Sequence, residues 1–594
     1  MWKLNQFNYN RRLSSVVKIG NLLLGGNQPI RVQSMANTDT NDIENSVAQC
    51  LRIIEAGGEL VRFTAQGVRE AESLKLIRDG IREKGCDVPL VADIHFNTNA
   101  ADVAARNVEK VRINPGNYVG SIKIGDTSDY SDEEFEVEYQ KIRARFIPFL
   151  NICKEHHTAI RIGVNHGSLS ERMMNRYGDT SRGMVESCME FLRICKEENF
   201  DNLVISMKTS NTVMMVQTVR LLVDEMAKEN LHFPLHLGVT EAGDGEDGRI
   251  KSAVGIGALL ADGIGDTIRV SLSEEPEFEI PVGRLLVTYI SGRVNHAPIV
   301  ATENVLHFQF EYSRRKTHAV GNIGGDNVPV VIAPSEGNFA TVPDYILQDG
   351  KVLNLNTDLF SIYSPENIDA LQKDPAEIKF LKLKYPDLTP KLLGLLIERR
   401  DVVVLLTTSH LNGVGEQRAF FHTLLNAGCT VPVILNRNYS ENELQHLQIK
   451  AAADLGVLFI DGFGDGIYLE NEGKITVEEI NSVAFGILQA SRVRVTKTEY
   501  ISCPGCGRTM FNLQTVIAQI KARTSHLKGL KIGIMGCIVN GPGEMADADY
   551  GYVGAGRGKV SLYKKKECIE RNISEDEAVD KLIDLIKVNG DWHE

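Results

Sequence analysis

The sequence predicts an α/β fold in three parts: a (β/α)8 TIM barrel, an inserted, degenerate α/β barrel-like domain, and a small C-terminal α+β domain. Three observations predict it. Short β-branched runs alternate with helical patterns in the first half of the chain, a weaker version of this alternation follows residue 293, and a cysteine-rich motif pair lies near the end. The length of 594 residues also exceeds that of one core. The expected boundaries are 1–293, 294–490 and 491–594.

Eight candidate strands lie in the first part, and each precedes a helical pattern or a turn. Eight βα units over about 250 residues is the size of a (β/α)8 barrel. An open doubly wound sheet is the alternative, but no G-x-G-x-x-G motif follows the first strand. The first helix is expected over 42–56, with Asn41 as its N-cap. The expected strands are 30–35, 59–65, 88–96, 110–117, 158–168, 202–211, 233–243 and 266–273.

Polar side chains gather at the C-terminal ends of these strands, where the catalytic groups of such barrels meet. Any one of them alone would more simply be a surface ion pair or a structural residue. Four arginines and a lysine in one mouth, however, repel one another unless an anion lies between them, and guanidinium groups match phosphate oxygens. We therefore expect a pocket for a small anion, most simply a diphosphate. The candidates are Arg62, Thr64, Asp93, His95, Arg112, Asn114, Arg161, Asn165, Lys208, Ser210, Glu241, Arg269 and Ser271.

The segment 294–490 resembles the first part in its alternation of strand and helix patterns and in one short repeated motif. Asp461-Gly-Phe-Gly-Asp-Gly-Ile-Tyr468 follows the pattern of Asp262-Gly-Ile-Gly-Asp-Thr-Ile-Arg269, with a tyrosine in place of the arginine. We interpret the insert as a partial, degenerate barrel that kept the scaffold, lost the anion site and acts as a spacer. Its strands are expected at 328–334, 402–409, 431–436 and 455–465, and a helix at 416–427.

Two motifs in the last part supply three thiols and one carboxylate: S-C-P-G-C-G-R-T at 502–509 and G-I-M-G-C-I-V-N-G-P-G-E at 533–544. Thiolates are soft ligands that suit zinc or iron–sulfur clusters, whereas a carboxylate exchanges more readily and would leave one iron open to an incoming oxygen. The spacing favours a cluster. Structural zinc, completed by Cys568 or His526, is the alternative. The candidate ligands are Cys503, Cys506, Cys537 and Glu544.

The motif pair resembles that of the IspG (GcpE) family, the 4-hydroxy-3-methylbut-2-enyl diphosphate synthases of non-mevalonate isoprenoid biosynthesis. The resemblance covers both terminal parts, and the extra length is similar to the long, three-domain form of the family. It implies a 4Fe-4S cluster held by Cys503, Cys506, Cys537 and Glu544. It further implies a pocket for a cyclic diphosphate lined by Arg62, His95, Arg112, Arg161, Asn165, Lys208, Glu241, Arg269 and Ser271.

The implied reaction is a two-electron reductive opening of 2-C-methyl-D-erythritol 2,4-cyclodiphosphate with loss of water, which yields the allylic diphosphate. In this scheme Glu544 gives up its iron to a substrate oxygen, Glu241 donates a proton, and flavodoxin or ferredoxin supplies electrons. A barrel lyase or transferase with a structural zinc is the alternative enzyme. An iron–sulfur RNA-binding or scaffold protein is the alternative outside catalysis.

Charge and hydropathy exclude two classes of partner. The net charge of −13 argues against a nucleic-acid binder, and the sequence lacks an apolar run long enough to span a membrane. The first residues have no apolar signal core, so we expect a cytoplasmic protein. Either a monomer or a homodimer is compatible with the sequence.

Overall fold

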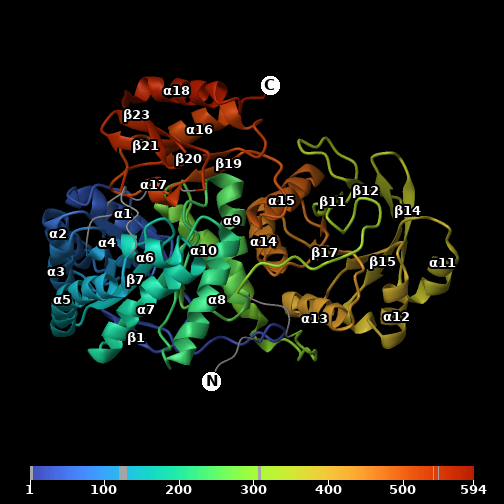
Figure 1. The fold of residues 1–594 in the computed structure, drawn as a ribbon, viewed down its shortest axis with the longest axis horizontal. Helices are drawn as coiled ribbons and strands as arrows, with labels where there is room; N and C mark the ends of the chain where they lie inside the picture. Colours follow the sequence, from blue (N-terminus) through green and yellow to red (C-terminus); the bar gives the residue numbers. More distant parts are fainter. Residues whose placement is uncertain (1–4, 120–129, 305–309, 540, 546, 594) are drawn as a thin grey trace.

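Two barrels and a smaller mixed sheet organise the chain, and Figure 1 shows them as three bodies. The computed structural model describes residues 5–119, 130–304, 310–539, 541–545 and 547–593. Within these ranges, no helix combines the length and the apolar character that crossing a membrane requires. The C-terminal body lies over one end of the first barrel, and the second barrel lies beside the first (Figure 1).

The first barrel contains all eight expected strands in a parallel sheet with the order β8-β7-β6-β5-β4-β3-β10-β9. A parallel bridge between Ile205 and Leu235 joins the two ends of this sheet. The prediction of a TIM barrel is therefore confirmed. The strands are β3 (Arg31–Met35), β4 (Leu60–Ala65), β5 (Leu90–Ile94), β6 (Lys110–Ile113), β7 (Ala159–Asn165), β8 (Leu203–Lys208), β9 (His236–Leu237) and β10 (Thr267–Ile268).

Helices surround these strands (Figure 1). The first begins one residue later than expected: Asp42 is its N-cap and accepts from the Asn45 backbone N–H at 3.2 Å, whereas Asn41 donates to Glu70 at 2.9 Å. The prediction of Asn41 as the cap was wrong. The helices are α1 (Ile43–Glu55), α2 (Val68–Glu83), α3 (Thr98–Asn107), α4 (Pro115–Tyr118), α5 (Asp132–His156), α6 (Glu171–Tyr177), α7 (Ser181–Glu197), α8 (Thr212–Lys228), α9 (Gly245–Ala261) and α10 (Glu279–Ser291).

An N-terminal hairpin, β1 (Val17–Ile19) and β2 (Leu22–Leu24), closes the end of the barrel where the strands begin. Its apolar side chains pack against residues at the starts of four barrel strands, and this cluster has almost no exposed surface. The floor of the barrel is therefore apolar, as in an ordinary core. The packed residues are Val17, Ile19, Leu24, Leu60, Val91, Ala159 and Val204.

The insert forms a second barrel, and the eight strands close completely instead of forming the expected partial barrel. Two of its strand pairs, β12–β13 and β13–β14, are antiparallel. The strands are β11 (Val330–Ala333), β12 (Tyr345–Gln348), β13 (Lys351–Asn354), β14 (Leu359–Tyr363), β15 (Lys379–Leu383), β16 (Val402–Leu406), β17 (Val433–Tyr439) and β18 (Gly466–Asn471). The helices are α11 (Ile368–Lys373), α12 (Pro390–Glu398), α13 (Gly413–Asn426), α14 (Leu444–Ile460) and α15 (Val477–Ala490).

One expected strand of the insert is wrong. Residues 455–460 belong to α14, and the strand starts only at Gly466. Because α14 is buried almost throughout its second half, its apolar run shows no helical period and reads like a buried strand. The lumen of this barrel is packed with apolar side chains, and Tyr468, the counterpart of Arg269, lies among them at 3% exposure.

The repeated Asp-Gly-x-Gly-Asp motif joins the two barrels. Asp262 follows α9 and Asp461 follows α14, and these two helices pack against each other. Arg220 of α8 bonds Asp262 at 2.8 Å and Asp461 at 2.9 Å. Arg418 of α13 bonds the same two carboxylates at 2.9 and 2.8 Å. All four side chains are buried. The motif repeated in the sequence therefore forms a buried cluster of two arginines and two aspartates between the barrels, which we call the ion quartet.

The C-terminal domain is a five-stranded mixed sheet with the order β19-β20-β21-β22-β23. Its first three strands are parallel, and the last two pairs are antiparallel. The elements are β19 (Glu499–Ser502), β20 (Lys531–Met535), β21 (Tyr550–Gly556), β22 (Lys559–Lys564), β23 (Glu567–Ser574), α16 (Leu513–Thr524), α17 (Gly541–Glu544) and α18 (Glu575–Val588).

Ion pairs at the start of α9 and a serine contact hold this domain over the first barrel. Lys251 bonds Glu499 at 2.9 Å, and the hydroxyl of Ser273 bonds both Ser502 Oγ and the Cys503 carbonyl at 2.9 Å. Two further pairs bind lysines of the C-terminal part to carboxylates near the α9 N-terminus: Lys497 with Asp247, and Lys521 with Asp244. The strand β19 therefore ends directly above the mouth of the barrel.

The quartet predicts a large loss of stability in Arg418→Ala. The free energy of unfolding should fall by about 3–5 kcal/mol, because Asp262 and Asp461 stay buried with one cation instead of two. Denaturant unfolding followed by circular dichroism measures this change. Arg523→Ala, which breaks an exposed pair with Asp580, is the control and should have little effect. An Arg418→Ala protein as stable as this control would contradict the role of the quartet.

Candidate active site

A pocket lies between the mouth of the first barrel and the C-terminal domain, and one chain provides both of its walls. The barrel residues that the family resemblance implies for the pocket all line it, together with Asp93 and the three thiols. Thr64, Asn114 and Ser210 are buried but are not part of this lining. The predicted residues that the structure brings together are Arg62, Asp93, His95, Arg112, Arg161, Asn165, Lys208, Glu241, Arg269, Ser271, Cys503, Cys506 and Cys537.

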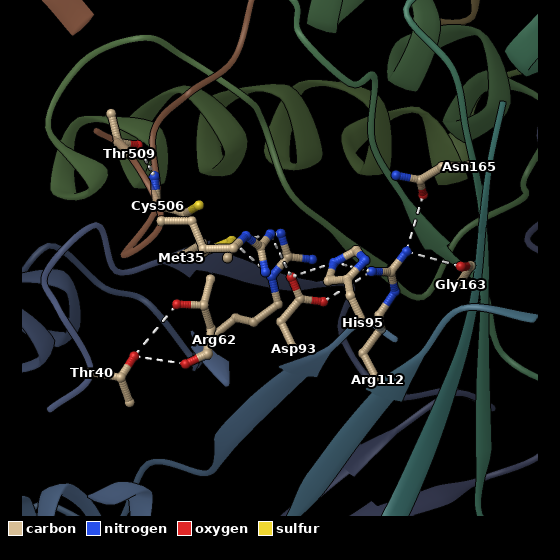
Figure 2. Close-up of polar contacts among 12 residues, drawn as sticks. Met35, Thr40, Arg62, Asp93, His95, Arg112, Gly163, Asn165, Cys506 and Thr509 are labelled. Carbon is tan, nitrogen blue, oxygen red and sulfur yellow. Dashed lines mark hydrogen bonds and ion pairs between the residues drawn. The ribbon is translucent and has the colours of Figure 1, made fainter. Parts of the chain in front are cut away.

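Asp93, at the end of β5, is the central carboxylate of the barrel wall. Figure 2 shows Arg62 and Arg112, from the adjacent strands β4 and β6, and His95, which follows β5, pointing toward it. Arg112 Nη1 lies 3.2 Å from Asp93 Oδ1, and His95 Nε2 lies 3.4 Å from Oδ2. Burial alone would raise the pKa of Asp93, but the charges of Arg62 and Arg112 outweigh it and hold that pKa well below its usual range. Asp93 is therefore a fixed anion that orients two cations.

His95 is neutral and has a defined tautomer. Burial and the charge of Arg112 lower its pKa to about 3. Its Nε2 lies 2.8 Å from Arg112 Nη1 and 3.4 Å from Asp93 Oδ2. Because the contact to the guanidinium is shorter and a guanidinium only donates, we assign Nε2 as the acceptor and the ring proton to Nδ1. Within the described residues Nδ1 has no hydrogen-bond partner. His95 can thus donate a hydrogen bond to a ligand.

The five predicted cations differ in how their charge is compensated. Arg269 pairs with Glu279 at 2.9 Å, and Arg112 pairs with Asp93. Arg161 reaches Asp93 only at 4.0 Å, and its Nε and Nη1 have no partner in the described part of the chain.

Two further cations sit in the same pocket with depressed pKa values. Burial and repulsion by neighbouring arginines lower the pKa of Lys208, and burial lowers that of Arg62 to about 10 despite the charge of Asp93. Positive charge thus exceeds negative charge in the described barrel wall, which favours an anionic ligand.

Glu241 occupies the turn between β9 and α9 with a left-handed backbone, φ 48°. Such a conformation is costly for a residue with a side chain and concentrates at functional sites. The side chain is buried, lines the pocket and is close enough to raise the pKa of Cys503. Its carboxylate therefore faces the thiol side of the cavity.

The three thiols enter the pocket from two loops of the C-terminal domain. Burial is the main cause that raises the pKa of Cys503 and Cys537, and the charge of Cys506 raises both further. The Gly536 N–H donates to Cys503 Sγ at 3.2 Å, and Arg508 lies between Cys537 and Asp93. Thiolates this close repel one another unless a cationic centre binds them, so the donor set fits an iron–sulfur cluster.

Glu544 ends α17, whose first residue, Gly541, lines the pocket. The side chain of Glu544 lies outside the described residues. Its loop touches the barrel, since a Cβ added to Gly167 would lie 2.1 Å from the Gly543 carbonyl oxygen. The backbone of α17 thus lies at the rim of the thiol pocket and beside the loop that follows β7.

The residues that would complete a zinc site lie elsewhere. Cys568 is on β23, opposite Tyr563, and the His526 ring packs edge-on to Trp592 at 5.0 Å. Neither lines the pocket. In the described ranges, no three His, Cys, Asp or Glu side chains are grouped as ligands of a single metal ion. The structural-zinc alternative is not favoured.

Sequence reasoning missed several residues of the site, among them Met35, Thr509 and Glu279. Met35 sulfur lies 2.7 Å from Arg62 Nη2, and Thr509 Oγ1 accepts from the Cys506 N–H at 3.0 Å (Figure 2). Glu279 pairs with Arg269 although it begins α10. None of the three had a signal in the sequence, because the pairing of Glu279 with Arg269 depends on how α10 returns to the barrel.

The fold and the site define a (β/α)8-barrel enzyme whose anion pocket is completed by a thiol-bearing second domain. Residues 14–284 match the GcpE TIM-barrel domain, and residues 499–588 match the GcpE protein C-terminal domain. With the full-length relatives below, these matches show that the chain belongs to the GcpE (IspG) family.

Three relatives illustrate how far the similarity extends. A protein of Parabacteroides distasonis is 60% identical, with 99% of each chain covered. One of Porphyromonas gingivalis is 52% identical over the whole of both chains, and one of Chlorobaculum tepidum is 41% identical over 99% of this chain and 90% of its own. All three are named 4-hydroxy-3-methylbut-2-en-1-yl diphosphate synthase (flavodoxin). The similarity includes the insert.

The uncompensated charge of Arg161 predicts opposite effects of Arg161→Met on binding and on stability. Affinity for inorganic diphosphate should fall roughly 10- to 100-fold, because hydrogen bonds to charged groups contribute about 1.5–3 kcal/mol. The unfolding temperature should rise, since a buried cation without a close counter-charge is removed. Calorimetric titration and thermal melts measure the two quantities. Arg106→Met, on the exposed face of α3, is the control; equal affinity in both variants would contradict the pocket assignment.

Proposed function

We propose that this chain is a 4-hydroxy-3-methylbut-2-en-1-yl diphosphate synthase that opens 2-C-methyl-D-erythritol 2,4-cyclodiphosphate by two-electron reduction and releases water. One observation carries the proposal: five cations of the barrel, Arg508 and three thiols line the same cavity of one chain. The names of the relatives agree with it. A barrel lyase or transferase with a structural zinc would not need its thiols to line the anion pocket.

The barrel wall binds the diphosphate. Arg161 reaches a carboxylate only at 4.0 Å, and Lys208 forms no ion pair among the described residues. Arg62 shares the single carboxylate of Asp93 with Arg112, so these three side chains gain most from an anion. Arg112 and Arg269 are held by Asp93 and Glu279 and act as oriented donors. Binding energy from the phosphates thereby fixes the reacting carbons, which lie away from the phosphates, against the thiol side of the pocket. Asn165 and Ser271 supply neutral hydrogen bonds at the same wall.

Cys503, Cys506, Cys537 and Glu544 would hold a 4Fe-4S cluster, which when bound supplies electrons one at a time and a Lewis-acidic iron. The carboxylate is the exchangeable member of this set. Arg508 stabilises the thiolates and links them to Asp93, 3.8 Å from its Nη2. This link holds the loops that carry the cysteines against the barrel wall.

Two groups are placed to handle protons and oxygen atoms. The Nδ1–H of His95 is a fixed neutral donor for a phosphate or bridging oxygen. Glu241, held on a left-handed turn beside Cys503, is the proposed proton donor to the oxygen that leaves as water. The Gly167–Gly543 contact and the lid formed by β19 limit the access of water from above the barrel.

The electron donor is proposed to be flavodoxin, because the relatives carry it in their names. Lys564 to Lys566, a basic turn, lies at the opposite end of the sheet from the thiols: Lys564 pairs with Tyr550, whereas the chain enters the Cys537 loop after Met535, which pairs with Val553. A donor that docks on this turn would be far from the cluster. The thiol end of the sheet is the better docking end.

Loss of the cluster is expected in Cys537→Ser and not in Cys568→Ser. Both change one half-buried thiol of the same domain, but only Cys537 lines the pocket. Anaerobically purified protein should contain about four irons per chain and a broad thiolate-to-iron absorption band, with activity under reduced flavodoxin. The iron and zinc contents, the spectrum and the turnover measure the effect. A pale, iron-free wild-type protein that still turns over would contradict the proposed function, and metal loss in Cys568→Ser would favour zinc.

The insert is proposed to hold the barrel and the C-terminal domain of one chain face to face, so that the site needs no second subunit. Barrel and cluster loops of one chain already face each other, and the ion quartet anchors the second barrel to the first. We expect a monomer whose turnover number does not change on dilution. Small-angle scattering and activity measured at the same concentrations test this; an obligate head-to-tail dimer that loses activity on dissociation would count against it.

A further inference from the structure

A layer of polar side chains lies inside the first barrel between the apolar floor and the anion pocket. Barrel interiors of this type are usually filled by branched apolar side chains. Here Gln33, Lys110, His236 and Thr267, from β3, β6, β9 and β10, occupy that position, and we call them the polar layer. All four are at most 1% exposed. None of them lines the pocket above.

Lys110 is two residues before Arg112 on β6, so both side chains point into the barrel. Its Nζ has one neutral partner, Gln33 Oε1 at 3.4 Å, and no ion pair in the described ranges. A lysine ammonium brings three donors and is almost never fully buried without a counter-charge. The environment of Lys110 therefore favours the neutral amine.

The charges around the polar layer all have one sign. Arg62 of β4 and Arg161 of β7 act on Lys110, and burial together with these two cations lowers its pKa well below the ordinary value. Burial, together with the cations of the barrel mouth such as Arg161, lowers the pKa of His236 as well. Below the layer, the facing residues of the floor are apolar. An anion entering the pocket thus adds negative charge to a barrel wall in which the described cations outnumber the carboxylates.

We infer that binding of the diphosphate draws a proton into the polar layer, with Lys110 as the acceptor. The inference concerns the substrate of the proposed function and rests on it for that identity. Its reason is charge balance: a diphosphate above Arg161 offsets the repulsion that keeps the Lys110 amine neutral. The step is proton uptake from solvent onto Nζ, and no bond in the ligand changes.

Lys110 is a better acceptor than the other two candidate bases. Lys208 lines the pocket and feels four arginines, whereas Lys110 feels two. His236 starts as a far weaker base than a lysine amine. If binding takes up a proton, the affinity for the ligand rises as the pH falls. By linkage, this rise occurs between the pKa of Lys110 in the complex and its lower pKa in the free protein. Lys110 is thus a positioning residue for charge, not a catalytic residue.

Calorimetric titration in buffers of different ionisation enthalpy counts the protons. The anaerobic holoenzyme, kept without reductant so that it does not turn over, is titrated with the cyclic diphosphate and separately with inorganic diphosphate at pH 7.5. Lys110→Met should take up about one proton fewer per ligand than wild type and lose the corresponding pH dependence of affinity. Iron content and circular dichroism establish that the variant is folded.

Lys379→Met is the matched control. Lys379 is the buried lysine of the second barrel, 1% exposed, and its Nζ has a carboxylate partner, Asp401. Its proton count should equal that of wild type. Lys110→Gln is the second variant if Lys110→Met fails to fold, because it keeps a polar contact to Gln33 without a titratable group.

Two results would overturn the inference: wild type binds without taking up a proton, or a folded Lys110 variant takes up as many as wild type. Failure of the proposed function looks different. Wild type would then ignore the cyclic diphosphate while inorganic diphosphate still drew a proton to Lys110, which supports the polar layer as an anion-linked proton acceptor.

Discussion

Mutual repulsion between buried cations is the constraint on which the rest of this structure depends. Arg62, Arg161 and Lys208 lie within one barrel mouth, and the charges of the described carboxylates do not balance them. Such a mouth is unfavourable in the free protein and favourable once an anion arrives. The apolar floor, the polar layer and the carboxylates that hold Arg112 and Arg269 all serve to keep this charge fixed in place.

The C-terminal domain converts an anion pocket into a redox site. Burial and the charge of Cys506 raise the pKa of Cys503 and Cys537, so the thiolates need a positive centre, whereas the barrel wall needs a negative one. The two requirements meet in a single cavity, and Arg508 and Asp93 connect the walls. This complementarity explains why the domain is clamped at the start of α9, the helix that follows directly on Glu241.

The sequence predicted the site better than the second barrel. The ends of barrel strands and the Cys motifs can be recognised from a few neighbouring residues. The sequence could therefore predict that the cations and the thiols belong to one site. Glu279 could not, since its contact with Arg269 depends on how α10 returns to the barrel. In the insert, α14 was misread because a helix buried on all sides loses its period, and the antiparallel strands β12 to β14 follow no βα rhythm. The Asp-Gly-x-Gly-Asp echo was visible, but its partners Arg220 and Arg418 come from distant helices.

Helix α9 determines how well the first barrel would behave if it were separated from the rest of the chain. From Gly248 to Ala261 nearly every residue is buried, and its outer side packs on α14 instead of facing water. The first barrel excised on its own would present this apolar helix, with Asp262 and Arg220 at its end, to solvent. Such a fragment would be prone to self-association, and the second barrel is therefore a permanent cover for the first.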